Sequence, residues 1–166
     1  MLALLNNIRM LLLASWLGAA IFFSAAVAPG AFRALRAANL PNAGEVAGSI
    51  VSRTLSIVNT SGFIFSLLLL ITAFALRKSY SQRAFIFQMV LLVIVAVATA
   101  VGEWVIAARM RGLRAGLRLA IDQLPASDPS RVAFDALHGY SVAALSIAII
   151  AALIAFFVIA ARVKSD

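Results

Sequence analysis

The residues best suited to chemistry lie around His138, the single histidine of the chain, in the stretch FDALHGYS. Asp135 stands three residues earlier and Ser141 three residues later, so all three share one face if this stretch is helical. Asp135 could then accept the imidazole proton, which would orient the ring and raise its basicity. The pattern predicts either an interfacial histidine that hydrogen-bonds a loop or a binding site for a proton, a metal ion or a haem-like cofactor.

A carboxylate in an apolar context is the second candidate. Glu103 follows the 19 charge-free residues from 84 to 102 and precedes Trp104, a residue type that favours membrane interfaces. One interpretation is an interfacial carboxylate that pairs with Arg53 or Arg109. The other is a group that takes up protons or binds a cation, because a buried carboxylate holds protons readily.

A polar stripe marks the first half of the second apolar region. Serine and threonine can bond back to the preceding helical turn, whereas Arg53 and Asn59 should face protein or water. The stripe predicts either helix packing through small and polar residues or the wall of a polar cavity. Its steps of 3, 1, 3, 3 and 1 residues fit one helix face, with Ser49, Ser52, Arg53, Ser56, Asn59 and Thr60 as members.

The residue types that are missing exclude several kinds of site. The chain has no cysteine, so disulfides, thiolate metal centres and thiol catalysis are ruled out. A single histidine excludes haem held by two histidines of one chain, and no phosphate loop, HExxH pair or nucleophile elbow occurs. We therefore assign no catalytic residue and no metal ligand, leave any cofactor unknown, and rank an enzyme as the least favoured class of function.

The composition of the chain predicts that membrane-spanning helices position these residues. The chain has 166 residues, of which 64% are hydrophobic and 12% are charged, against roughly 25% charged in soluble domains. So short a chain cannot bury that much apolar surface against itself, so lipid must cover much of it. Charge-free runs of about 20 residues predict membrane-spanning helices. We expect an all-α integral membrane four-helix bundle with short interfacial helices, a single domain over 1–166, with spans near 10–28, 54–76, 84–108 and 139–161.

Turn-forming residues set the expected ends of the first two helices. Pro29–Gly30 is a strong breaker pair and predicts the end of the first helix, followed by a short interfacial helix near Ala31–Ala38. Asn42 and Glu45 resemble a capping box, which predicts that the second helix begins near Ala43.

The third helix is expected to extend past the bilayer as an amphipathic arm, up to the break at PASDPS. Asp128 as N-cap and Pro129 at the first helical position open the fourth helix. Glycines that would allow close helix packing occur at Gly18, Gly44 and Gly48.

The formal charge of +8 comes from cations at the ends of apolar runs, where they meet lipid headgroups, and it does not indicate nucleic-acid binding.

Counting the spans brings distant residues to one membrane face. Four spans put both termini on one face, beside the basic turn between the second and third helices, and we expect that face to be cytoplasmic. The opposite face receives five polar residues that could converge as one cluster: His138, Asp135, Glu103, Arg53 and Asn59.

Three stretches carry a family resemblance: WLGAAIFFSAAVAPGAFRAL, AGEVAGSIVSR and DALHGYS. They resemble a family of small four-helix membrane proteins, the bacterial domain-of-unknown-function proteins related to vertebrate transmembrane protein 205. The resemblance covers nearly the whole chain and implies the four-helix fold. It implies little chemistry.

Two functions from different classes are therefore expected. The first is a binding or accessory subunit that packs in a larger membrane complex or a homo-oligomer, with the lipid bilayer and other membrane subunits as partners and no nucleic acid. The second is a transport or ligand-binding protein for a proton, metal ion or haem-like cofactor, which would use the polar cluster at the ends of helices two, three and four. The expected location is the bacterial cytoplasmic membrane.

Overall fold

The computed structural model describes residues 2–40, 42–77, 81–117 and 119–163, and these form four long helical runs. The first run consists of α1 (Leu2–Phe22), the π-helical turn η1 (Phe23–Val27) and α2 (Ala28–Ala37), and the second is α3 (Ala43–Ala75). The third run consists of α4 (Gln82–Ala100), the π-helical segment η3 (Val101–Ala107) and α5 (Ala108–Ala115). The fourth is α6 (Pro129–Val163), which follows the 3₁₀ turn η4 (Ile121–Gln123). Each run is long and apolar enough to cross a membrane. The predicted all-α four-helix membrane fold is confirmed.

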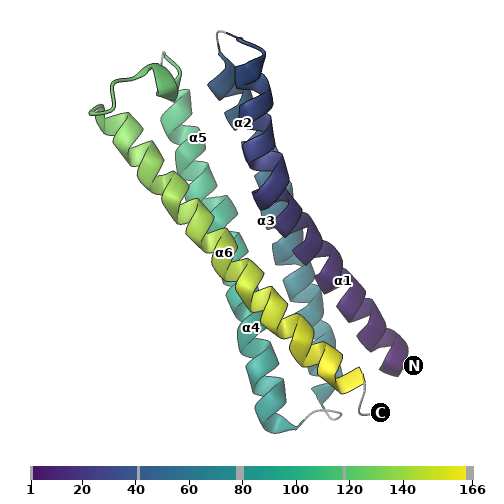
Figure 1. Ribbon diagram of the computed structural model, residues 1–166. Coiled ribbons are helices and arrows are strands. Elements are labelled where there is room, and N and C mark those ends of the chain that lie inside the picture. Colours follow the sequence, from purple (N-terminus) through teal and green to yellow (C-terminus); the bar gives the residue numbers. More distant parts are fainter. Residues whose placement is uncertain (1, 41, 78–80, 118, 164–166) are drawn as a thin grey trace.

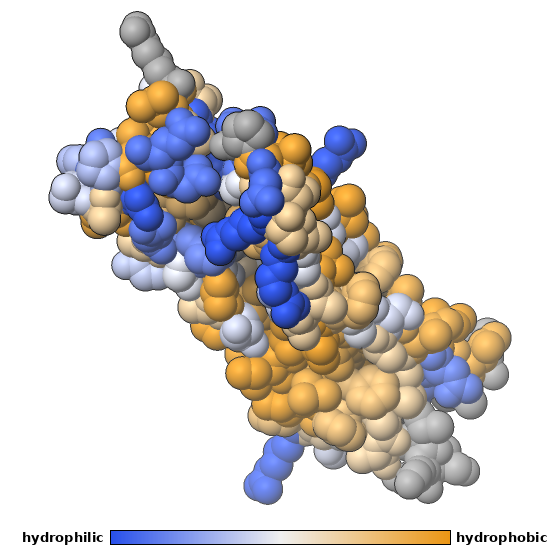
Figure 2. Space-filling view, turned by 45° about the horizontal axis from the view of Figure 1, so that its top comes forward, coloured by the Kyte–Doolittle hydropathy of each residue, from blue (hydrophilic) through white to orange (hydrophobic). Residues whose placement is uncertain are grey.

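The four runs form a bundle that opens toward one end (Figure 1). The start of α1 and the end of α6 lie at the opposite end, beside the end of α3 and the start of α4. Hydrophobic side chains cover the body of the molecule, and hydrophilic ones gather at the end that carries α2 and α5 (Figure 2). This distribution places the apolar body in lipid and the hydrophilic end at the membrane surface.

An indole resting on a glycine joins α1 to α3. Trp16 is buried, and its Nε1–H donates a 2.9 Å hydrogen bond to the carbonyl oxygen of Val58. A Cβ atom on Gly62 would come within 2.6 Å of that indole nitrogen, so only glycine leaves room for the ring. Because a buried N–H without a partner is costly in an apolar interior, this contact fixes the relative position of the two helices.

Alanines allow α6 to pack closely on α4 and α1. Ala148, Ala151, Ala152 and Ala155 are at most 4% exposed and recur at helical spacing on one face. In lipid, helices associate mainly through close packing, and small residues let their backbones approach. These residues form the core together with Leu92 and its neighbours on α4.

The predicted break at Pro29–Gly30 is wrong, because the helix runs through both residues. In a regular α-helix a proline removes one hydrogen bond and its ring collides with the carbonyl four residues earlier. Here η1, the wider π-helical turn, directly precedes α2 and changes that register, so the helix continues. The segment near Ala31–Ala38 is helical as predicted, but it prolongs α1. It ends where Asn39 takes the left-handed conformation with φ of 50°, which asparagine tolerates at helix ends.

The predicted starts of the second and fourth helices are correct, but the predicted capping box and the predicted length of the amphipathic arm are not. The fourth helix begins at Pro129, and Asp128 caps it by accepting a 2.8 Å hydrogen bond from the Ser130 backbone N–H. The second begins at Ala43, but Asn42 makes no side-chain capping bond, so the predicted capping box is wrong. The amphipathic arm is also shorter than predicted: α5 ends at Ala115, because Gly116 caps it and favours helix termination.

Candidate functional site

A groove lies between two pairs of helical runs at the open end of the bundle. The α2, η1 and α3 segments stand on one side, and α5 and α6 on the other (Figure 1). Its deeper part, here called the inner cavity, has a volume of about 600 Å³. Small-molecule pockets typically occupy roughly 300–1,000 Å³, so the inner cavity is large enough for a ligand.

Apolar side chains line most of the inner cavity. Phe23 and Leu55 come from the first side, and Val142 and Leu145 from α6. The two α6 residues belong to the predicted fourth span, 139–161, and that prediction puts this wall at the depth of the lipid chains. On the same prediction the inner cavity would extend from the membrane surface into the hydrocarbon region.

Charged residues line the outer part of the groove, here called the outer cavity, with a volume of about 300 Å³. The two cavities adjoin, because Arg36, Arg114, Phe32, Phe134 and Asp135 line both of them. The outer cavity carries three cations and three carboxylates, namely Arg36, Arg114, Arg131, Glu45, Asp122 and Asp135.

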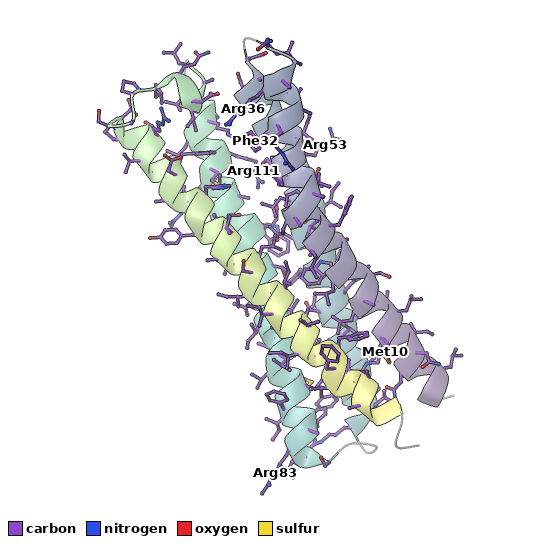
Figure 3. The ribbon with its side chains drawn as sticks, viewed as in Figure 1. Met10, Phe32, Arg36, Arg53, Arg83 and Arg111 are labelled. Atoms are coloured by element: carbon purple, nitrogen blue, oxygen red, sulfur yellow. The ribbon has the colours of Figure 1, made fainter. Side chains whose placement is uncertain are left out.

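Two arginines at the junction of the cavities stack on aromatic rings. The guanidinium carbon of Arg36 lies 5.9 Å from the centroid of the Phe32 ring, and that of Arg114 lies 4.8 Å from the centroid of the Phe134 ring. Figure 3 shows Arg36 and Phe32 on the side of α2 that faces α5. Such stacking holds a cation in place while its N–H groups stay available.

Neither of these guanidinium groups makes a hydrogen bond or a close salt bridge within the part of the chain that the structure describes, although the carboxylates of Glu45 and Asp122 attract Arg114 at longer range. The terminal nitrogen of Arg114 lies over Gly48, where a Cβ atom would come within 2.8 Å of it. Gly48 therefore makes room for the arginine at the junction. Arg131 differs, since its Nη1 donates a 2.6 Å hydrogen bond to the carbonyl oxygen of Leu124.

Both π-helical segments border the inner cavity. Phe23 and Ser24 of η1 line it from one side and Ala107 of η3 from the other. A π-helical turn costs hydrogen-bond geometry and is found disproportionately at functional sites. Two such turns on opposite walls of one cavity mark this part of the bundle as the candidate site.

A second polar cluster lies outside the groove. Glu103 in η3 is 6% exposed, and its Oε1 accepts hydrogen bonds from the Ser56 hydroxyl (2.9 Å) and from Nη1 of Arg111 (3.1 Å). Its Oε2 is buried and has no partner among the described residues. Asn59 lies against Gly102, where a Cβ atom would come within 3.1 Å of the amide nitrogen.

The five residues expected to form one polar cluster do not lie together in the structure. Glu103 and Asn59 lie at the interface of α3 and η3, whereas Asp135 and His138 line the groove. No hydrogen bond or ion pair joins Asp135 to His138 in the described part of the chain, and Arg53 is exposed.

The partner of Glu103 also differs from the two that were expected. It is Arg111, whose long side chain reaches back along its own helical run. Of the polar stripe, Ser56 and Asn59 face the neighbouring helix, and Ser52 lines the inner cavity.

The three glycines expected in helix packing have different surroundings. A Cβ atom on Gly18 would have nothing within 4 Å. Gly44 lies against the carboxylate of Asp122, and Gly48 lies under Arg114. Gly44 and Gly48 thus accommodate charged side chains at the groove.

Sequence reasoning missed the arginine–phenylalanine pairs. Phe32 and Arg36 are four residues apart, a spacing at which side chains of one helix meet, so this pair was visible in the sequence. Arg114 and Phe134 come from different helices, and no local pattern joins them. The described residues contain no group of three or more histidine, aspartate or glutamate side chains placed to hold a metal ion, and the metal and haem alternatives stay predictions.

Comparison with known proteins shows the family. No curated protein and no solved structure matches the chain. A family match covers residues 11–118, from α1 through α5, and stops before α6, which carries Asp135 and His138. Since the match spans more than half of the chain, the protein belongs to the DUF4149 family, a domain of unknown function.

Proposed function

We propose that the protein is a membrane-embedded binding protein that holds an amphipathic small molecule in its groove. The observation that carries this proposal is the inner cavity of about 600 Å³ with an apolar wall and two stacked arginines at its mouth. A pocket of this kind suits a ligand with an apolar part and a polar end. It differs from the second of the two expected functions, a site for a proton, metal ion or haem-like cofactor at the polar cluster, both in the class of ligand and in the residues used; of that cluster only Asp135 and His138 line the inner cavity.

The driving force would depend on where the ligand comes from. Each CH₂ group of a ligand that leaves water contributes about 0.8 kcal/mol, whereas an acyl chain that comes from the bilayer gains little free energy at the apolar wall. Selection would then depend on the polar end, where Arg36 and Arg114 can hold an anionic group. The proposal therefore assigns retention in the membrane to the cavity wall and specificity to its mouth.

Mass measurement tests the proposal. Protein extracted in mild detergent and analysed by native mass spectrometry should retain one bound amphiphile per chain. Ser52→Trp would fill the inner cavity from α3 and should remove that adduct, because Ser52 lines the cavity. Ile57→Trp on the same helix is the matched control, since Ile57 is 64% exposed to the lipid side. Wild-type protein without any adduct, or equal adducts in both variants, would contradict the proposal.

The first expected function, an accessory subunit in a larger complex or homo-oligomer, stays a prediction. We also propose a bacterial cytoplasmic membrane location with both chain ends inside, supported by the resemblance to bacterial proteins related to vertebrate transmembrane protein 205 and by the cations Arg77 and Arg83 beside the turn between α3 and α4. A reporter that is active only in the cytoplasm should be active when it is fused to the C-terminus. Activity of a reporter that works only in the periplasm would show the opposite orientation.

A further inference from the structure

We propose that the occupant of the groove is a phospholipid whose headgroup carries an amine, of the phosphatidylethanolamine type. Its phosphate would lie between Arg36 and Arg114, its ammonium group in the outer cavity, and an acyl chain in the inner cavity. This inference rests on the proposed function and names the ligand class of that same site.

The phosphate position follows from the two arginines. Arg36 and Arg114 line both cavities, so they mark the boundary between the apolar and the charged part of the groove. Each guanidinium is held over a phenylalanine ring and makes no hydrogen bond or close salt bridge among the described residues, so its N–H groups can meet phosphate oxygens while Glu45 and Asp122 attract Arg114 only at longer range. Planar guanidinium groups match the geometry of phosphate oxygens and can donate two parallel hydrogen bonds.

The amine follows from the carboxylates of the outer cavity. Glu45 of α3, Asp122 of η4 and Asp135 of α6 line it from three different elements. The three lining cations balance these three carboxylates when the groove is empty. A bound phosphodiester would add one negative charge, and a cationic nitrogen on the same headgroup would restore neutrality. A primary ammonium group can also donate hydrogen bonds to the lining carboxylates, whereas a trimethylammonium group has no N–H to donate.

Depth supports a membrane lipid as the source. Val142 and Leu145 belong to the predicted fourth span, which puts the inner cavity beside the lipid chains and the charged outer cavity at the headgroup level. A lipid in the bilayer has its phosphate and its chains in this same order. A free phosphate would leave the apolar wall without a partner.

A headgroup panel tests the inference. Delipidated protein in detergent is mixed with equal amounts of phosphatidylethanolamine, phosphatidylcholine and phosphatidylglycerol that carry the same acyl chains, and the bound species are counted by native mass spectrometry. We expect phosphatidylethanolamine to be preferred by about two- to fivefold, the discrimination that one partly exposed ion pair provides. Equal or stronger binding of either other lipid would overturn the inference but leave the proposed function standing.

Variants separate the two parts of the headgroup. Arg36→Gln with Arg114→Gln should weaken binding of all three lipids by about tenfold or more. Glu45→Gln with Asp122→Asn should abolish the preference and keep total binding. Arg53→Gln is the control, because Arg53 is an exposed arginine of α3 that lines neither cavity. Arginine variants that bind like the control would overturn the inference, and wild-type protein that binds no lipid would overturn the proposed function as well.

Discussion

The two ends of the bundle are built from the same four helical runs but pack in opposite ways. At the end where the chain begins and α6 ends, called here the closed half, Trp16 lies on Gly62, and four alanines of α6 are buried: Ala148, Ala151, Ala152 and Ala155. At the other end, called here the groove half, phenylalanines and arginines line an open space. Small residues bring helices together in the closed half, and large stacked side chains hold them apart in the groove half.

The π-helical segments lie where one half passes into the other. Regular α-helix forms α1 and α4 in the closed half, and η1 and η3 follow before the groove opens. A wider turn rotates all later residues around the helix axis. This rotation lets one helical run present a packing face in the closed half and a cavity wall in the groove half. The residues that stabilise the bundle and the residues that line the groove therefore lie at different positions along the same helices.

The largest expected effect concerns the closed half. Gly62→Leu should destabilise the protein by about 3 kcal/mol, because the added side chain collides with the indole of Trp16 and displaces its hydrogen bond to Val58. Thermal unfolding in detergent measures the loss. Gly18→Leu is the matched control, since nothing lies within 4 Å of its Cβ position. Equal unfolding midpoints for the two variants would show that the indole does not lock α1 to α3.

A smaller effect is expected where the halves meet. Arg111→Ala should cost about 1–3 kcal/mol, because it leaves the buried carboxylate of Glu103 with only the Ser56 hydroxyl as a described partner. Arg53→Ala removes an exposed arginine and should leave the unfolding midpoint unchanged. If both alanine variants unfold at the same temperature, Glu103 does not depend on its ion pair.

The smallest effect should be confined to the groove half. Asp128→Ala removes the N-cap of α6 and should cost about 1 kcal/mol. Hydrogen exchange should rise in the first turns of α6 and stay unchanged around Ala148–Ala155, because the closed half packs independently of that cap. The neighbouring Ser127→Ala, an exposed position, serves as control. Faster exchange along the whole of α6 would contradict the separation of the two halves.

The sequence predicted the fold because apolar run length is a local property. Asp128 before Pro129 likewise announced the start of α6, since a cap depends only on its own helix. The passage of the helix through Pro29 was not predictable in this way. It depends on a π-helical turn, and the stretch Phe23–Val27 carries no residue pattern that signals one.

The candidate site was only partly predictable. Asp135 and His138 do line the groove, because both stand near the start of α6, at the open end of the bundle. Arg114 could not be anticipated, since its position depends on Phe134 and Gly48, which lie on two other helices. Depth follows from position along a helix, whereas the face on which a side chain meets a neighbour follows from packing.

Thiol labelling tests the central claim, that the groove half holds a ligand while the closed half is sealed. The natural chain has no cysteine, so Ser52→Cys and Ser66→Cys each introduce one thiol on α3. Ser52 lines the inner cavity, and Ser66 is 1% exposed in the closed half. With a small membrane-permeant reagent, we expect the thiol at position 52 to react, phosphatidylethanolamine to slow that reaction, and the thiol at position 66 to stay unreacted. Similar rates at both positions, or a rate at position 52 that the lipid does not change, would contradict the claim.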